Sequence, residues 1–111
     1  MATSKVGLFG TSTRTNTLLA IHLLGETHAS EMAALLGRTL SRIQDAIESL
    51  ERAGIVVGIE EGKARRVRLN PHYPAKSELE ALLTKIGSED VELQKLLAQK
   101  RRRPRRLGKE I

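Results

Sequence analysis

The sequence predicts a mostly helical fold with one small β-hairpin, built as a single domain of 111 residues. Apolar residues repeat at spacings of three and four in five segments, as expected of helices with one buried face. Only between residues 55 and 69 does the period change to two, which is typical of strands. A chain of this length has room for one small core, and with one Phe, one Tyr and no Trp that core must be aliphatic.

Three helices are expected before the hairpin. Residues 1–11 form a flexible arm, and an apolar face then begins at Thr13 and ends near Gly25. A second helix follows and stops at Gly37, which can take the left-handed conformation of a helix end. The third helix covers residues 39–53, with Thr39 as its N-cap. The residues expected on its inner side are Ile43, Ala46, Ile47, Leu50 and Ala53.

Two alternating segments with a glycine turn between them predict the hairpin. Ile55, Val57 and Ile59 alternate in the first, and Val67 and Leu69 lie inward in the second. The two prolines within residues 70–74 then interrupt regular structure, so this stretch is expected to be a loop.

Leucine stripes predict two further helices within residues 75–100. The first ends near Gly87, and the second starts at Ser88, where the following acids suit the positive end of a helix. Two interpretations are open: the stripes complete the core of the monomer, or they form a dimer interface. We favour the dimer interface, because a thin aliphatic core leaves apolar surface to cover.

The net charge of +6 is concentrated at the C-terminus. Residues 101–111 hold six Lys or Arg and one acidic residue, so the preceding part is only mildly basic. The run "RRRPRR" has no apolar partner, and we expect residues 101–111 to be a disordered basic tail when free. Three interpretations of this tail are open: it grips phosphate, which we favour, it binds RNA or an acidic protein surface, or it is inert. Its candidate phosphate contacts are Arg101, Arg102, Arg103, Arg105 and Arg106.

The third helix is the candidate recognition element for DNA. Short polar residues at a helix start suit entry into the major groove, where Arg reads guanine and Gln reads adenine. We therefore assign Arg42 and Gln44 to base edges, Thr39 and Ser41 to phosphate, and Arg38 to positioning on the backbone. Two roles are open for Asp45: it accepts from cytosine N4, or it repels phosphate.

The alternative interpretation is an ordinary three-helix core whose polar face is only exposed to solvent. The hairpin favours DNA binding over this alternative. It carries Lys63, Arg65, Arg66 and Arg68, and alternation puts Arg66 and Arg68 on its outer face. A basic hairpin beside a recognition helix can lie along phosphate or enter the minor groove.

Residues 8–83 resemble a winged helix-turn-helix domain of the ArsR-like transcription regulators. The resemblance lies in "HASEMAALLGRTLSRIQDAIESLERAGIV", with the spacing from second helix to recognition helix, and in "VVGIEEGKARRVRLNP", which is similar to the wing. The segments "LFGTSTRTNTLLAIHLLGE" and "RLNPHYPAKSELEALL" also resemble DNA-binding domains fused to toxin-type nucleotidyltransferases. This resemblance implies a winged helix-turn-helix with two C-terminal helices that binds DNA as a homodimer, with the recognition helix in the major groove. The cysteine motif of the metal-sensing members is absent, so metal induction is not implied. Only residues 70–111 follow the hairpin, so the nucleotidyltransferase domain of the fused proteins is not expected here.

Other functional classes have little in the sequence to favour them. The chain has no cysteine, and its histidines (His22, His28 and His72) lack metal-ligand spacing, so we expect no metal site and no cofactor. His22 is expected at the edge of the core, His28 in a helix cap and His72 in the proline loop. No nucleophile or carboxylate pair stands out, and we expect a protein without enzymatic activity that is cytoplasmic and nucleoid-associated, with no membrane segment.

The sequence thus predicts a sequence-specific regulator of transcription, a repressor in preference to an activator, that binds double-stranded DNA as a homodimer at a roughly palindromic site. Two alternatives are open. One is an architectural DNA-binding protein in which tail and hairpin dominate, and the other is the DNA-binding module of a separate toxin or enzyme.

Overall fold

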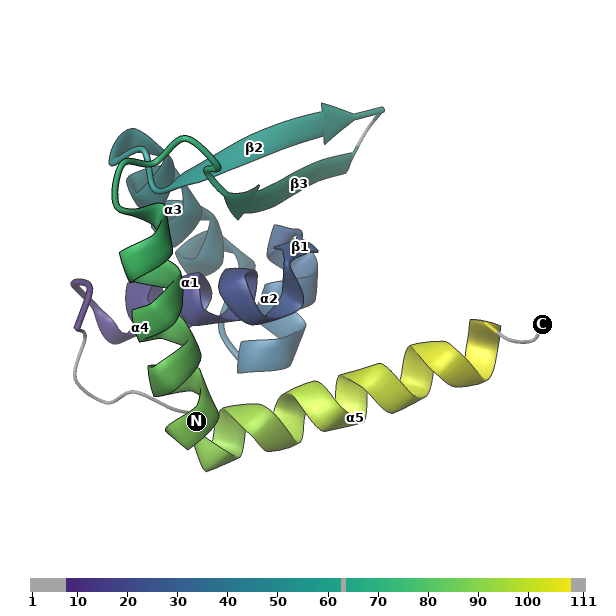
Figure 1. Cartoon of the computed structure of the whole chain (residues 1–111). Coiled ribbons are helices and arrows are strands. Elements are labelled where there is room, and N and C mark those ends of the chain that lie inside the picture. The colour runs from purple at the N-terminus through teal and green to yellow at the C-terminus, as the bar shows by residue number, and fades with distance from the viewer. Residues whose placement is uncertain (1–7, 63, 109–111) are drawn as a thin grey trace.

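The computed structural model describes residues 8–62 and 64–108, with side chains at 8–60, 62 and 65–100. This part of the chain is mostly helical with a small antiparallel sheet, which confirms the predicted fold class (Figure 1). In chain order its elements are α1 (Ser12–Leu24), β1 (Glu26–Thr27), α2 (Ala29–Leu36), α3 (Leu40–Arg52), β2 (Val56–Glu61), β3 (Ala64–Leu69), α4 (Lys76–Glu89) and α5 (Val91–Gly108).

Helix α1 is the centre of the molecule. Every residue from 15 to 21 is buried, and the neighbouring helices α2, α3 and α4 all contact it (Figure 1). Thr11 caps its first turn by accepting from the backbone N–H of Arg14 at 3.1 Å. Before the cap, Phe9 packs on the core and donates its N–H to Thr15, so the last residues of the expected N-terminal arm are attached to the domain. Residues 1–7 of that arm lie outside the described residues.

The turn between α2 and α3 follows the sequence prediction. Gly37 has a left-handed backbone with φ of 65°, and Thr39 caps α3 by accepting from the N–H of Arg42. Ile43, Ala46, Ile47 and Leu50 are buried, as expected. The expectation for Ala53 was wrong, since the helix ends there and its side chain is exposed.

The predicted hairpin is formed by β2 and β3, and β1 adds a third strand in the order β1-β3-β2. Val56 is the buried residue of β2, and it shares a face with Leu69 and with Val67, which is also buried. Val57 and Ile59 therefore lie on the opposite face, half-buried. Strand β1 was not predicted, because two residues are too short to show a period.

Helix α4 runs through Gly87, where the sequence predicted its end. A Cβ at this buried glycine would stand 3.0 Å from Leu23 Cδ1, so the residue allows α4 to approach α1 closely. The helix ends at Glu89, and Asp90 caps α5 by accepting from the N–H of Leu93 at 3.0 Å. Ser88, the expected start of the last helix, is still within α4.

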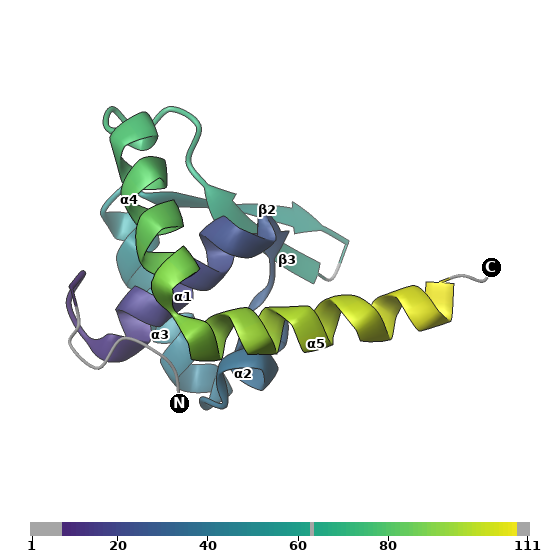
Figure 2. The same cartoon turned by 60° about the horizontal axis from the view of Figure 1, so that its bottom comes forward.

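The leucine stripes of α4 and α5 pack into the chain's own core. Leu83, Leu93 and Leu97 are buried there, so these three leucines complete the core of the monomer and the dimer interface stays a prediction for the remaining apolar residues of the two helices. Figure 2 shows α4 crossing α1 and α5 passing in front of α2, and both pairs of helices are in contact. Leu82 and Val91 remain exposed, at 43% and 67%.

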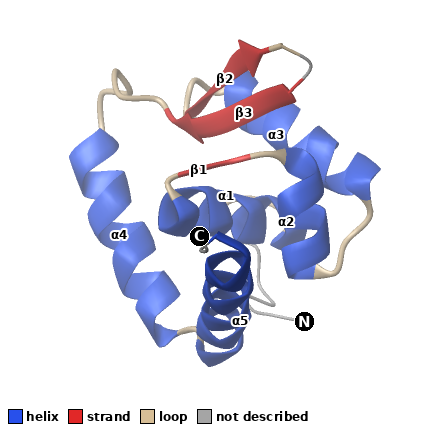
Figure 3. Ribbon diagram, turned by 90° about the vertical axis from the view of Figure 1, so that its right-hand side faces the viewer, coloured by secondary structure: helices blue, strands red, loops and turns tan. Residues whose placement is uncertain are grey.

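Helix α5 continues to Gly108, where the sequence predicted disorder from residue 101. Arginine has a good helix propensity, and a helix already anchored by Leu93 and Leu97 can extend one residue at a time without a new nucleus. The far half of α5 projects away from the body on the same side as the hairpin tip (Figures 1 and 3). Within the described residues, no helix is long and apolar enough to cross a membrane.

Candidate nucleic-acid interface

One face of α3 is open to solvent. Ser41, Arg42, Gln44 and Asp45 are all exposed, while the opposite side of the same helix is buried against the core. The apolar residues of α3 therefore fix the direction of its polar side chains. Thr39, although exposed, has its hydroxyl engaged in the helix cap.

Two hollows flank this open face. The hairpin-side hollow, of about 340 Å³, lies between α3, the start of α2 and β3, and Gln44 and Arg65 line it. The α1-side hollow, of about 400 Å³, lies between α3 and the first turn of α1, and Arg42 and Arg14 line it. Asp45 lines both hollows, so it stands on the ridge between them.

The ridge of α3 is not basic. Besides Asp45 it carries Glu48, whose carboxylate lies 3.9 Å from Arg52 in the next turn. The helix sequence LSRIQDAIESLER holds two arginines and three acids in all. The helix α3 therefore carries no net positive charge of its own.

Arg65 does not present the free charge that the sequence predicted for it. Its guanidinium forms an ion pair with Glu51 of α3, and Nε lies 3.7 Å from Glu60 of β2. Gly58 permits this arrangement, since a Cβ there would stand 2.5 Å from Arg65 Nη2. Arg65 thus attaches the hairpin to α3, and two carboxylates compensate its charge.

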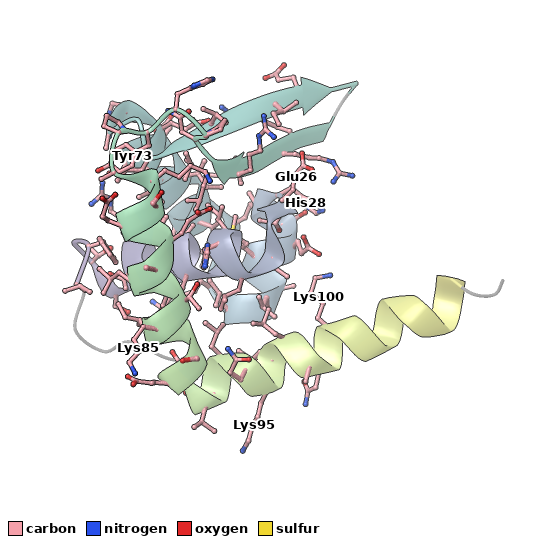
Figure 4. The ribbon with its side chains drawn as sticks, in the orientation of Figure 1. Glu26, His28, Tyr73, Lys85, Lys95 and Lys100 are labelled. Atoms are coloured by element: carbon pink, nitrogen blue, oxygen red, sulfur yellow. The ribbon has the colours of Figure 1, made fainter. Side chains whose placement is uncertain are left out.

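Arg66 and Arg68 share the outer face of the hairpin, as predicted, and both are exposed. Arg68 lies opposite Glu26 of β1 in the register, and Figure 4 shows Glu26 at this edge of the sheet. The acid was not anticipated, because β1 itself was not. It reduces the local positive charge at the base of the hairpin.

Arg38 lies in the turn before α3, as expected. It donates to the hydroxyls of Thr13 at 2.8 Å and Ser12 at 3.1 Å, so it also connects this turn to the start of α1. Arg14 lies nearby and was not among the predicted residues; its Nη1 donates to the carbonyl of Phe9 at 2.7 Å. The sequence offered one indication of it, a basic residue in the first turn of a helix, where acids are usually preferred.

Lys63 lies outside the described residues, and so do the side chains of the arginines of the expected tail, whose backbone belongs to α5. The last described side chain of α5 is Lys100. It points toward the body (Figure 4) and forms an ion pair with Glu31 of α2.

The Glu31 carboxylate is held ionised by its neighbours. Burial raises its pKa, but contacts with Lys100 and Thr27 and the nearby His28 outweigh burial, and the net pKa lies below the ordinary value. His28 caps α2 by accepting from the N–H of Glu31, which confirms its predicted place. His22 lies 2.8 Å from the Thr84 hydroxyl of α4. Among the described residues, no group of three or more His, Cys, Asp or Glu side chains could hold a metal ion.

No protein-family model matches the chain, and no curated protein is significantly similar to it in sequence.

Proposed function

We propose that the protein is a winged helix-turn-helix, ArsR-like regulator of transcription that binds a specific sequence in double-stranded DNA. The open polar face of α3 carries the proposal, because a helix whose apolar side is packed on a core can present its other side to base edges. On this view α3 is the recognition helix and the β2–β3 hairpin is the wing. The protein acts in the cytoplasm at the nucleoid, without enzymatic activity.

The two hollows fit this mode of binding. The major groove is about 12 Å wide, close to the diameter of a helix with its side chains, about 10–12 Å. When a helix enters the groove, a sugar-phosphate backbone passes on each side of it. The hairpin-side and α1-side hollows supply space for these two backbones.

Three exposed side chains of α3 then have roles defined by their positions. Arg42 borders the α1-side hollow and Gln44 the hairpin-side hollow, and both reach base edges from the flanks of the ridge. Asp45 faces the centre of the groove. A carboxylate there is repelled by phosphate and gains only where a base donates to it, as cytosine N4 does, so it excludes other sequences.

Selection from a random duplex pool at physiological salt tests the proposal. The wild-type protein should enrich one motif, and Arg42→Ala and Gln44→Ala should each blur the base preference at separate positions. Lys85→Gln, a substitution on the outer face of α4 where Lys85 is paired with Glu89, is the control and should enrich the wild-type motif. Absence of any enriched motif for the wild-type protein would contradict sequence-specific binding.

We also propose that the protein binds as a homodimer on a palindromic site, because one recognition helix covers only a short half-site. Among the described side chains of α4 and α5, Leu82 and Val91 are exposed large apolar residues that such an interface could use. Binding at the promoter then represses by occlusion. Sedimentation at micromolar concentration tests the dimer, with and without a palindromic duplex; a monomer in both samples would contradict it.

An architectural DNA-binding protein is the second candidate. The extension of α5 favours it, since a projecting helix that contains five arginines could grip any duplex. Specific and random duplexes of equal length would then bind within about tenfold of each other.

A further inference from the structure

We infer that the start of α1 and the turn before α3 form a second contact with DNA, in which Arg14 and Arg38 hold the backbone phosphates of one strand. The inference rests on the proposed function, and it names the part of the surface that supplies the attraction to the polyanion.

Charge compensation separates the arginines around α3 into two groups. Arg65 is paired with two carboxylates and Arg52 with one, so the protein itself balances their charges. Within the described part of the chain, the partners of Arg14 and Arg38 are neutral: a backbone carbonyl for the first and two hydroxyls for the second. Their positive charge is therefore available to an external anion.

The same hydrogen bonds hold both guanidiniums in place. Arg38 is fixed at two nitrogens by Thr13 and Ser12, and Arg14 is folded back over Gly10, with Nη1 on the Phe9 carbonyl. A side chain that is already ordered loses less conformational entropy when it binds. Both residues are partly exposed, but the Nε of Arg14 is buried and has no hydrogen-bond partner among the described residues, so its terminal nitrogens are the donors that we assign to phosphate.

The position of these arginines suits one strand of a duplex on α3. Arg14 lines the α1-side hollow together with Thr11 and Thr13, and Arg42 closes the hollow on the α3 side. The opposite hollow is lined by Arg65, whose charge is compensated. The two strands are thus held unequally, and the α1 side contributes most of the salt dependence of binding.

Ser12→Asp is the test variant. It places a carboxylate where the Ser12 hydroxyl lies 3.1 Å from Arg38, and an acid in the first turn of a helix favours folding. Ser77→Asp makes the same change in the first turn of α4 and is the matched control. Arg38→Gln and Arg14→Gln remove the cations directly, and thermal melting establishes that each variant is folded.

The readout is the slope of log affinity against log salt for a fixed duplex. We expect Ser12→Asp and each Gln variant to reduce the slope by about 0.9 for every phosphate that the protein no longer neutralises, equally for specific and random duplexes. Ser77→Asp should keep the wild-type slope. If Ser12→Asp and Ser77→Asp behave alike, the inference is wrong while the proposed function stands; if the wild-type protein binds no duplex, the proposed function itself fails.

Discussion

Truncation of Leu83 should destabilise the isolated monomer strongly, whereas truncation of its neighbour Leu82 should not. Leu83 on α4 is fully buried in the core, at 0% exposure, while Leu82 is 43% exposed. Leu→Ala at buried sites costs about 2–5 kcal/mol, because apolar burial decreases and a cavity remains. We expect about 3 kcal/mol for Leu83→Ala, and less than about 1 kcal/mol for Leu82→Ala, where water already covers much of the side chain.

Thermal and urea unfolding measure both values. For a domain of this size, about 3 kcal/mol corresponds to a fall in Tm of about 12–20 °C. The difference between the wild-type and Leu83→Ala midpoints should be the same at low and high protein concentration, since Leu83 packs within one chain. Equal small effects for the two variants, or a Leu83→Ala effect that grows on dilution, would show that α4 packs its apolar side chains against another molecule.

Three further outcomes are expected. Gly58→Ala should lower the free energy of unfolding by about 1 kcal/mol more in the wild-type protein than in an Arg65→Ala variant, because the added Cβ displaces the Arg65–Glu51 pair. Additive effects of the two substitutions on the free energy of unfolding would contradict this. The folded-state pKa of Glu31 lies below its ordinary 4.5, so the stabilisation by its carboxylate is present above that value and is lost as the pH falls through the lowered pKa. The stability difference between the wild-type protein and Glu31→Gln should therefore shrink in acid, and a difference that stays constant with pH would exclude the Lys100–Glu31 pair as its cause. Asp45→Asn should bind DNA more tightly overall and change the base preference at one position toward adenine; an unchanged motif in duplex selection would remove Asp45 from base readout.

The sequence predicted the helices and the hairpin because each has a period that local spacing reveals. Thr39 and Gly37 were assigned correctly for the same reason, since caps are determined by neighbouring residues in the chain. Gly87 was assigned wrongly as a helix end. Its role is a close approach to Leu23 of α1, which no local pattern reveals.

The sequence predicted which residues of α3 are exposed, but not which arginines have their charge neutralised by a carboxylate. The exposed residues of α3 follow from its buried stripe, and their positions agree with the sequence analysis. The sequence could not show that Glu51 neutralises the charge of Arg65 or that Arg38 donates to Ser12, because these contacts join segments that are distant in the chain. Only the tertiary structure separates arginines that hold the fold together from arginines that can attract a ligand.

The ratio of two affinities tests the central claim most directly. The duplex enriched by selection and a scrambled duplex of equal length and composition are compared in competition at physiological salt. A sequence-specific regulator should prefer the enriched duplex by about 10³-fold or more, and Arg42→Ala should reduce that preference. Affinities within about tenfold of each other would contradict base readout by α3.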